Sequence, residues 1–286
     1  MREVSISQLW NRAWDLFKGN WLLFVGLYVL LVIAAFISIY TLIPGLVFLR
    51  FLILSFIDSR FFILGFIGLS FFIVSFIVLL IVPLILMPAF VRAGYLVARQ
   101  GQPSFGEVFR DISLLLNVFV YYLILTLIPG ILIGYGYMLV RAALDEALRE
   151  VTYGGMRGSM VSTETGDTLV LVGYILLFIL YLFGWAGPYA ILSGRAGIFD
   201  AIGQSFSLTA QNFGKVFLAL LSYIGLLIFV LIPGTVVFLK GFDSVWTLVG
   251  YLMWILMWYL IVLPMGSVFW PLLYLALTGE EGVPHS

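Results

Sequence analysis

The stretch WLLFVGLYVLLVIAAFISIYTLIPGLVF, residues 21–48, contains no charged side chain and decides the fold. A helix needs about 20 apolar residues to cross a hydrocarbon core about 30 Å thick, and this stretch is long enough. Further apolar runs come after it along the chain. The sequence therefore predicts six membrane spans, at about residues 21–48, 61–91, 113–140, 168–193, 216–239 and 246–276.

Composition supports the same interpretation. Of 286 residues, 63% are hydrophobic and only 10% are charged, whereas about a quarter of a soluble domain is charged. The runs are too long for barrel strands and do not alternate, so helices must satisfy the backbone inside the bilayer. We predict an all-α, polytopic membrane protein, a single membrane domain over residues 1–286. The first run is too long for a cleavable signal peptide, and we expect it to stay.

Lysine and arginine near the span ends predict the orientation. Eight lie on the side of the N-terminus and six on the other side. This bias favours the cytoplasmic membrane with both termini in the cytoplasm. The formal net charge of zero gives no general attraction for nucleic acid, so we expect no nucleic-acid partner.

A Leu-Ile-Pro-Gly motif occurs three times, in TLIPGLVFL (41–49), TLIPGILIG (126–134) and VLIPGTVVF (230–238). Proline removes one helical hydrogen bond and glycine permits a change of direction. We predict structural elbows in the outer third of the membrane, at Pro44 and Gly45, Pro129 and Gly130, and Pro233 and Gly234. A ligand-binding role is the alternative, because irregular backbone at this depth must face protein or a water-filled cavity.

An amphipathic segment precedes each odd-numbered span: SISQLWNRAWDLFKGN (5–20), SFGEVFRDISLLLN (104–117) and GIFDAIGQSFSLTAQN (197–212). Their apolar residues recur at helical spacing. Ser5 with Gln8, and Ser104 with Glu107, fit a capping box. The asparagines that close the segments are Asn20, Asn117 and Asn212. Each segment could lie in the membrane interface or pack against the bundle, and both alternatives stay open.

The segments, spans and motifs together predict an internal repeat. One unit consists of an amphipathic helix, an outgoing span, a turn and a returning span with prolines near its inner part. The units cover about residues 1–102, 103–196 and 197–286. Each begins on the same side of the membrane, so the repeats are parallel rather than inverted.

Candidate chemical groups are few. The chain has no cysteine and a single histidine, His285, in the C-terminal tail, which removes cysteine or histidine nucleophile systems and zinc sites from consideration. No nucleotide-binding motif occurs, and we expect no cofactor and no metal. Asp145, Glu146 and Glu150 indicate a solvated helix, and a Gly/Ser/Thr-rich loop over about 152–168 could be a lid or a partner contact. We therefore name no catalytic residue.

Two arginines are candidates for a lipid headgroup or another ligand, together with the three asparagines. Arg50 follows the first proline motif, and we expect residues 46–57 to form an interfacial or re-entrant segment. Arg92 lies near the inner boundary and is expected to anchor a helix end. Several tyrosines and a serine could line a cavity, although we favour helix packing for them: Tyr121, Tyr122, Tyr174, Tyr181, Ser222 and Tyr223.

The segment AIGQSFSLTAQNFGKVF (201–217) and the ending FWPLLYLALTG (269–279) carry a family resemblance. With Ala201, Ser205 and Asn212, and later Pro264 and Pro271, they resemble the membrane domain attached to some glycerophosphoryl diester phosphodiesterases. Related prokaryotic membrane proteins of the wider group stand alone without assigned activity. In the phosphodiesterases hydrolysis belongs to a separate soluble domain, so the resemblance implies membrane architecture and no catalytic residue.

These observations favour a non-enzymatic integral membrane protein of a prokaryotic cell. It would organise membrane lipids or partner proteins, including a homo-oligomer, through its interfacial helices. The alternative is a transporter or channel-like carrier of a lipid or small amphiphile. An intramembrane enzyme fits least well, because acid, base and nucleophile are not combined in any constellation.

Overall fold

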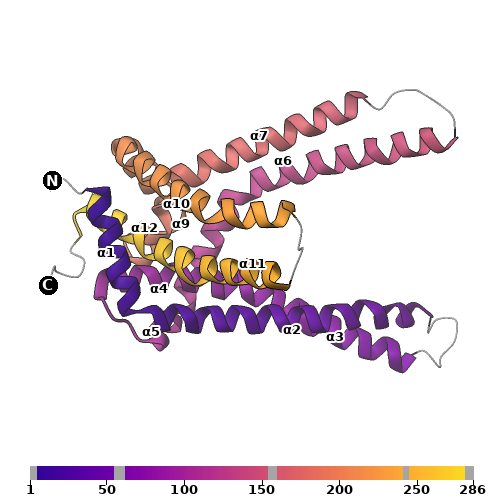
Figure 1. Ribbon diagram of the computed structural model, residues 1–286, viewed down its shortest axis with the longest axis horizontal. Helices are drawn as coiled ribbons and strands as arrows, with labels where there is room; N and C mark the ends of the chain where they lie inside the picture. Colours follow the sequence, from indigo (N-terminus) through magenta and orange to yellow (C-terminus); the bar gives the residue numbers. More distant parts are fainter. Residues whose placement is uncertain (1–4, 55–61, 154–159, 241–244, 281–286) are drawn as a thin grey trace. The chain divides into compact units, whose positions relative to one another are not determined.

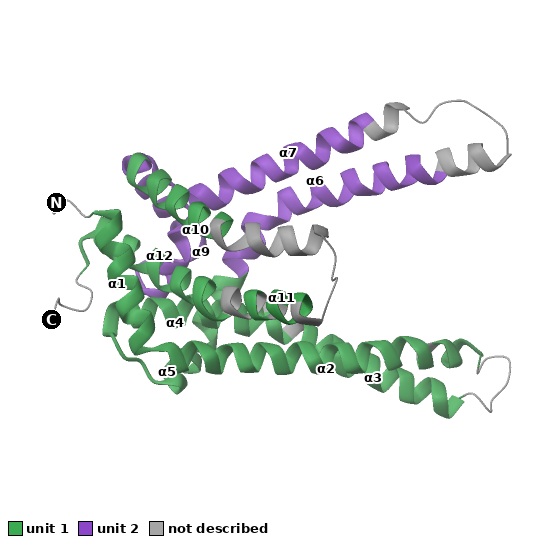
Figure 2. Cartoon of the chain, viewed as in Figure 1, with its two compact units in different colours: residues 1–119, 214–286 green, residues 120–213 purple. Residues whose placement is uncertain are grey.

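The computed structural model describes residues 5–54, 62–153, 160–240 and 245–280, and its regular elements in these ranges are all helical (Figure 1). The all-α prediction is confirmed. The chain divides into two compact units: unit 1 comprises residues 1–119 and 214–286, and unit 2 comprises residues 120–213 (Figure 2). Each unit is described by itself.

Unit 1 contains a helical hairpin, made of α2 and α3, and a group of helices that pack together, α1, α4 and α12. Its elements are α1 (Ile6–Gly19), α2 (Trp21–Leu54), α3 (Phe62–Ile81), the π-helical segment η2 (Val82–Leu86), α4 (Met87–Gln100), α5 (Phe105–Phe109), most of α10 (Phe213–Lys240), α11 (Val245–Met257), the π-helical segment η3 (Trp258–Val262) and α12 (Leu263–Thr278). Helices α2 and α3 lie side by side, α4 packs on α12, and α1 packs on both. In Figure 1, α1 runs across the direction of α2.

Unit 2 contains one long hairpin and a helix docked at its base. Helix α6 (Ile112–Tyr153) enters it at residue 120, and α7 (Met160–Gly184) returns beside it. The chain is interrupted at Trp185 and Ala186, continues as α8 (Gly187–Leu192), and then forms α9 (Ile198–Gln211). Helix α9 packs against α7 and α8.

Five helices of the described residues are long and apolar enough to cross a membrane: Trp21–Leu54, Phe62–Gln100, Ile112–Asp145, Glu164–Leu192 and Leu260–Thr278. A sixth is obtained if α9 and the first part of α10, interrupted at Asn212, count as one broken span. The chain is thus a multi-pass membrane protein. The predicted loop over 152–168 is wrong at both ends, because α6 continues to Tyr153 and α7 already begins at Met160; residues 154–159 lie outside the description.

The Leu-Ile-Pro-Gly motifs do not end helices. Pro44 lies inside α2 and Pro129 inside α6, while Pro233 and Gly234 fall within the backbone of α10. The prediction that the outgoing helix ends before each motif is wrong, because a long apolar helix tolerates one missing hydrogen bond when neighbouring groups compensate. An elbow in the sense of a change of direction within the helix stays a prediction. The described glycines also differ: a Cβ on Gly45 would lie 2.9 Å from the backbone nitrogen of Phe72, whereas nothing lies within 4 Å of one on Gly130.

The C-terminal ends of α4, α8 and α12 share a feature that the Leu-Ile-Pro-Gly motifs lack. Among the described residues, positive φ angles occur at three glycines, 85° at Gly101, 73° at Gly194 and 71° at Gly279. Gly101 and Gly279 cap α4 and α12, and Gly194 follows the last residues of α8. An L side chain rarely adopts this conformation, so glycine permits the stop. Three residues after Gly101 and Gly194 come Ser104 and Gly197, the N-caps of α5 and α9.

Helices α1 and α9 have the same local build. Each has 14 residues and ends on an asparagine, Asn20 with φ −123° and ψ 15°, and Asn212 with φ −122° and ψ 26°. In each, the amide of the asparagine donates a hydrogen bond to the carbonyl four residues earlier, Leu16 for Asn20 and Leu208 for Asn212. These two asparagines therefore close their segments as predicted.

The second segment is built differently. Helix α5 ends at Phe109, α6 begins at Ile112, and Asn117 is exposed inside α6. The prediction that Asn117 closes the segment is wrong, because Asp111 caps α6 earlier with hydrogen bonds from the backbone of Ser113 and Leu114. The Ser104 backbone N–H donates to the Glu107 carboxylate at 2.7 Å, as a capping box requires. In α1, by contrast, the Ser5 hydroxyl pairs with the Ser7 hydroxyl, and no side-chain cap forms.

Candidate functional site: the docking sites of the inner helices

The break between α7 and α8 is the main irregularity in unit 2. Pro188 is the second residue of α8 and is buried. Because proline has no backbone N–H, it cannot bond the carbonyl four residues earlier, which belongs to Gly184. The Tyr121 hydroxyl on α6 donates to that carbonyl instead. The carbonyl that the proline leaves free is thus satisfied from a neighbouring helix.

Helix α9 satisfies the other groups at the break. The Ser205 hydroxyl donates to the Phe183 carbonyl at 2.7 Å and accepts from the Ala186 N–H at 3.0 Å. Thr209 accepts from the indole N–H of Trp185 at 3.0 Å. Both α9 side chains are almost completely buried, 1% and 0% exposed. An unpaired polar group costs several kcal/mol in an apolar medium, so these contacts make the break tolerable.

Small residues allow Tyr121 to approach the break. Tyr121 is fully buried, and a Cβ added to Gly187 would overlap its ring. A Cβ on Gly184 would lie 2.6 Å from Leu125. The favoured interpretation of Tyr121 as a packing residue thus agrees with the contacts it makes.

Unit 1 has prolines at corresponding places without an open break. Pro88 and Pro264 are the second residues of α4 and α12, and each of these helices follows a π-helical segment. In η2 the hydrogen bonding shifts by one residue, so that the Met87 N–H donates to the Val82 carbonyl. A wider turn of this kind keeps the helix continuous around a proline.

Helix α1 docks on this continuous surface through apolar side chains. Leu9, Ala13 and Phe17 are buried, with Ala13 fully so. They are the fourth, eighth and twelfth residues of α1, the positions that Ala201, Ser205 and Thr209 occupy in α9. The two helices therefore dock through the same face with different chemistry.

Trp10 and Asn20 fix the position of α1. The indole N–H of Trp10 donates to Ser222 at 2.9 Å, and its ring stacks on Phe269 with centroids 3.9 Å apart. The Asn20 amide donates to the Gly101 carbonyl at 2.6 Å, which ties the end of α1 to the end of α4. Asn20 is therefore a structural residue here, since its amide donates to two backbone carbonyls.

The two candidate arginines differ. Arg92 is 9% exposed, and its guanidinium donates to the Asp111 carbonyl at 2.8 Å, so it holds the junction between α5 and α6. Arg50 is exposed on α2, which continues to Leu54. The re-entrant alternative is therefore wrong over residues 46–54, because the backbone stays helical, and the interfacial alternative stays a prediction; residues 55–57 lie outside the description.

The tyrosines and serine proposed as cavity-lining residues pack on one another or on tryptophan. Tyr122 and Tyr181 stack with centroids 6.1 Å apart, and the hydroxyls of Tyr137 and Tyr174 lie 3.5 Å apart. Tyr223 lies beside Trp10 with centroids 6.2 Å apart, and Ser222 accepts the indole hydrogen bond.

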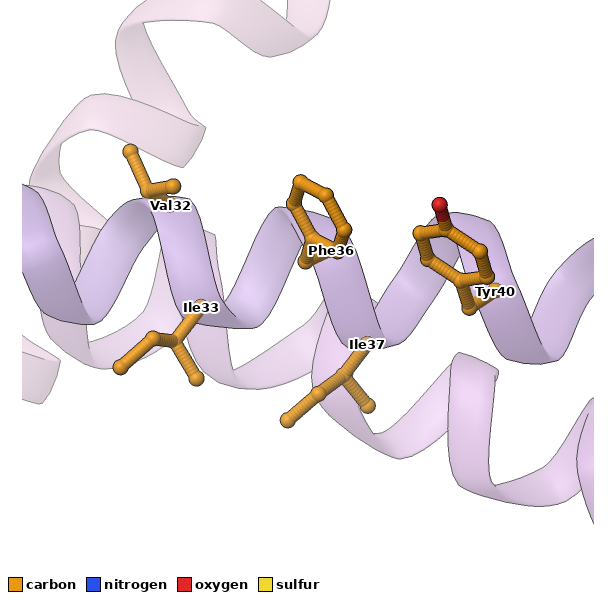
Figure 3. A pocket seen from close by; sticks show the side chains of 5 residues that line it. All are labelled: Val32, Ile33, Phe36, Ile37 and Tyr40. Atoms are coloured by element: carbon orange, nitrogen blue, oxygen red, sulfur yellow. The ribbon is translucent and has the colours of Figure 1, made fainter.

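An apolar hollow of about 500 Å³ lies along α2 (Figure 3). The described residues that line it all come from this one helix: Val32, Ile33, Phe36, Ile37 and Tyr40. The rings of Phe36 and Tyr40 stack with centroids 5.0 Å apart, and each lining side chain is more than one third exposed. The hollow is thus an open apolar feature on the surface of one helix.

Acid and histidine groupings suited to a metal ion do not occur within the described parts of the chain. Asp145 is exposed; His285 and the side chains of Glu146 and Glu150 lie outside the description.

Sequence reasoning did not single out Ser205 and Thr209 as a docking pair. Two signals point to them: they share a helical face with Ala201, and the sequence GWAGP, residues 184–188, places a proline four residues after Gly184. A proline inside an apolar span leaves a carbonyl without its donor, and hydroxyl side chains on a nearby segment are natural partners.

Comparison with family models, with curated proteins and with solved structures finds no match to the chain. The resemblance to the phosphodiesterase membrane domain therefore stays a prediction. The contacts within the chain are the remaining source of information on its function.

Proposed function

We propose that the chain is a non-enzymatic protein of the cytoplasmic membrane that organises lipids or partner proteins at the inner membrane face. The observation that carries this proposal is the docking of α1 and α9. Both are held on their units through the same face, and both leave large side chains exposed beside it, Trp14 at 39% and Phe199 at 77%. A rigidly held helix with exposed aromatic residues provides a fixed contact surface for lipid or protein.

We further propose that three copies of one unit build the chain. The equal lengths and caps of α1 and α9 support this, as do the prolines at the second positions of α4, α8 and α12 and the positive-φ glycines that end these helices. Only α5 departs, being five residues long. In this proposal, what repeats is an amphipathic helix together with a helix that has proline at its second position and ends at a positive-φ glycine. The Leu-Ile-Pro-Gly motif is not the repeated element.

Both termini face the cytoplasm in this proposal. An even number of spans puts the two ends of a chain on one side of a membrane, and six is the upper count among the described residues. Within unit 1, the start of α1 and the end of α12 lie at the same end in Figure 1, which supports this arrangement. The lysine and arginine bias favours the cytoplasmic side.

Native mass spectrometry of the gently extracted protein tests the role. We expect reproducible retention of phospholipid, a second copy or a partner, and reduced retention for Trp14→Ala. The matched control is Asp15→Ala on the exposed polar face of α1, which should retain as much as the wild type. Retention of nothing, by either the wild type or the control, would remove the basis of the proposal.

The alternative of a lipid or amphiphile carrier has one observation in its favour, the hollow on α2. A carrier would move fluorescent phospholipid between leaflets of proteoliposomes faster than protein-free vesicles do. Replacing Phe36 by Ala would then change that rate. An organising protein leaves the rate at the level of the protein-free vesicles.

A further inference from the structure

Helix α9 has three distinct faces. Ala201, Ser205 and Thr209 are buried against α7 and α8. The opposite face is polar and exposed, with Asp200, Gln204, Ser207 and Gln211. Between the two runs a stripe at helical spacing, Phe199, Ile202 and Phe206. An amphipathic helix whose apolar stripe lies between a docked face and a polar face fits the boundary of a membrane.

The exposure of this stripe increases toward the start of α9. Phe206 is half-buried and packs on Phe183 with ring centroids 5.4 Å apart. Ile202 is also half-buried, and Phe199 is 77% exposed. The stripe is thus partly covered at Phe206, beside the C-terminal end of α7, and becomes exposed toward Phe199 at the start of α9.

The stripe continues the apolar surface of the neighbouring span. Helix α7 belongs to the candidate span Glu164–Leu192 and exposes large apolar side chains, including Phe178 at 51% and Ile179 at 42%. Ile179 lies four residues before Phe183, on the same face of the helix. Phe183 on α7 links that surface to Phe206 on α9. Exposed Arg195, just before α9, supplies a positive charge of the sign that phosphate headgroups attract.

We infer that the stripe of Phe199, Ile202 and Phe206 binds the lipid surface of the membrane, with its rings among the upper acyl chains and the polar face of α9 in water. This inference rests on the proposed function and names its partner as phospholipid. It assigns a continuous lipid-facing stripe to α9 in particular. In α1 the equivalent positions, Ser7, Trp10 and Trp14, include a serine and a tryptophan that is hydrogen-bonded within unit 1.

Site-directed spin labelling tests the inference, since the chain has no natural cysteine. Single variants Phe199→Cys and Ile202→Cys would carry the label on the stripe, Gln204→Cys and Ser207→Cys on the polar face, and Phe178→Cys on the span. Full-length labelled protein in phospholipid nanodiscs is then exposed to oxygen, which concentrates in lipid, and to a water-soluble nickel chelate.

We expect the oxygen-to-nickel accessibility ratio at 199 and 202 to approach that at 178 and to exceed that at 204 and 207 several-fold. Equal ratios at 199 and 204 would overturn the inference: low values would place the stripe in water, and high values would place α9 inside the bilayer as half of a broken span. Low accessibility to both reagents at 199 would show that protein covers it, which also overturns the inference.

This test and the test of the proposed function fail separately. The accessibility ratios report where α9 lies, whether or not the protein retains anything. If the ratios are as expected and nothing is retained in native mass spectrometry, the organising role fails and the lipid contact stands. If lipid is retained and the ratios at 199 and 204 are equal, the role stands and the contact lies elsewhere.

Discussion

Helices α1 and α9 use the same positions to dock and different chemistry to do so. In α1 the docking residues are Leu9, Ala13 and Phe17; in α9 they are Ala201, Ser205 and Thr209. Helix α1 rests on α4 and α12, where π-helical segments keep the backbone continuous around the prolines. Helix α9 rests on α7 and α8, where the backbone is broken.

The difference shows what determines the docking residues. A continuous helix bonds most of its own backbone groups, so it is covered best by close apolar packing. A broken helix presents a carbonyl and an N–H that need partners, so it is covered best by hydroxyl groups. The state of the partner's backbone thus decides whether the docking helix carries apolar or polar side chains.

The largest effect is expected at the close contact between α4 and α12, the two helices on which α1 packs. Gly94 on α4 lies against the backbone carbonyl of Ser267 on α12, and an added Cβ would overlap that oxygen. Gly94→Ala must push two helices apart, which should lower the free energy of unfolding by more than about 3 kcal/mol. Thermal unfolding in detergent measures this change. Gly225→Ala, with nothing within 4 Å of its Cβ, is the matched control, and an equal loss in both variants would contradict the prediction.

The polar docking face comes next. Ser205→Ala leaves the buried Ala186 N–H unpaired and leaves the Phe183 carbonyl with only the longer bond from Thr209, at 3.4 Å, which should lower the free energy of unfolding by about 2–3 kcal/mol. The reciprocal change in α1, Ala13→Ser, should cost less, because a helical serine can bond the carbonyl four residues earlier. Melting curves of both variants compare the two faces. If Ala13→Ser costs as much as Ser205→Ala, the explanation by free backbone groups is wrong.

The asparagine caps should differ in the opposite direction and at a smaller scale, with the larger loss in α1. Asn20→Ala removes hydrogen bonds to the Leu16 and Gly101 carbonyls, and Asn212→Ala removes the bond to Leu208. At about 1 kcal/mol per hydrogen bond, we expect losses of about 2 and about 1 kcal/mol. Chemical unfolding in mild detergent measures both. Asn117→Ala, at an exposed position in α6, should change little.

A stabilising change should be available on the polar face of α9. Gly203 is helical and exposed, and nothing lies within 4 Å of its Cβ. Gly203→Ala should raise the free energy of unfolding by about 0.5–1 kcal/mol, because alanine forms helix more readily than glycine. A higher melting temperature checks this. A loss of stability would mean that this face is covered rather than free.

The smallest effect concerns the junction that lacks an asparagine cap. The hydrogen bond from the Ser113 hydroxyl lowers the pKa of Asp111, and the backbone of α6 and Arg92 act in the same direction. A lowered pKa in the folded state stabilises the fold above the unfolded value of about 3.9, and this contribution is lost as the pH falls through the folded value. Melting temperatures of the wild type should fall below about pH 4 more steeply than those of Asp111→Asn. Parallel curves would exclude the carboxylate.

Sequence reasoning found most of the long apolar helices because a helix that crosses a membrane needs an uninterrupted apolar run. It placed their ends less well. The segment STETGD, residues 162–167, looks like a loop by composition, yet α7 begins at Met160. The proline motifs misled for a related reason: Pro44 and Pro129 lie in helices long enough to continue past one missing hydrogen bond.

The docking sites needed information that no local pattern contains. The periodicity of α1 and α9 predicts one face for each, and the asparagines mark their ends. Which face meets which backbone depends on the break at Trp185 and Ala186, formed by residues of α7 and α8. Asn117 shows that such a mark can also fail. Asp111, six residues earlier, caps the start of α6, and Asn117 is exposed inside that helix.

The hydroxyl group of Ser205 also matters for the membrane as an electrical insulator. A break in a spanning helix usually draws in water to satisfy its backbone, and a file of water can conduct protons. Here a serine, a threonine and a tyrosine side chain take the places that water would fill. The span Glu164–Leu192 is therefore interrupted at Trp185 and Ala186 with these backbone groups bonded to side chains, so that they do not require water.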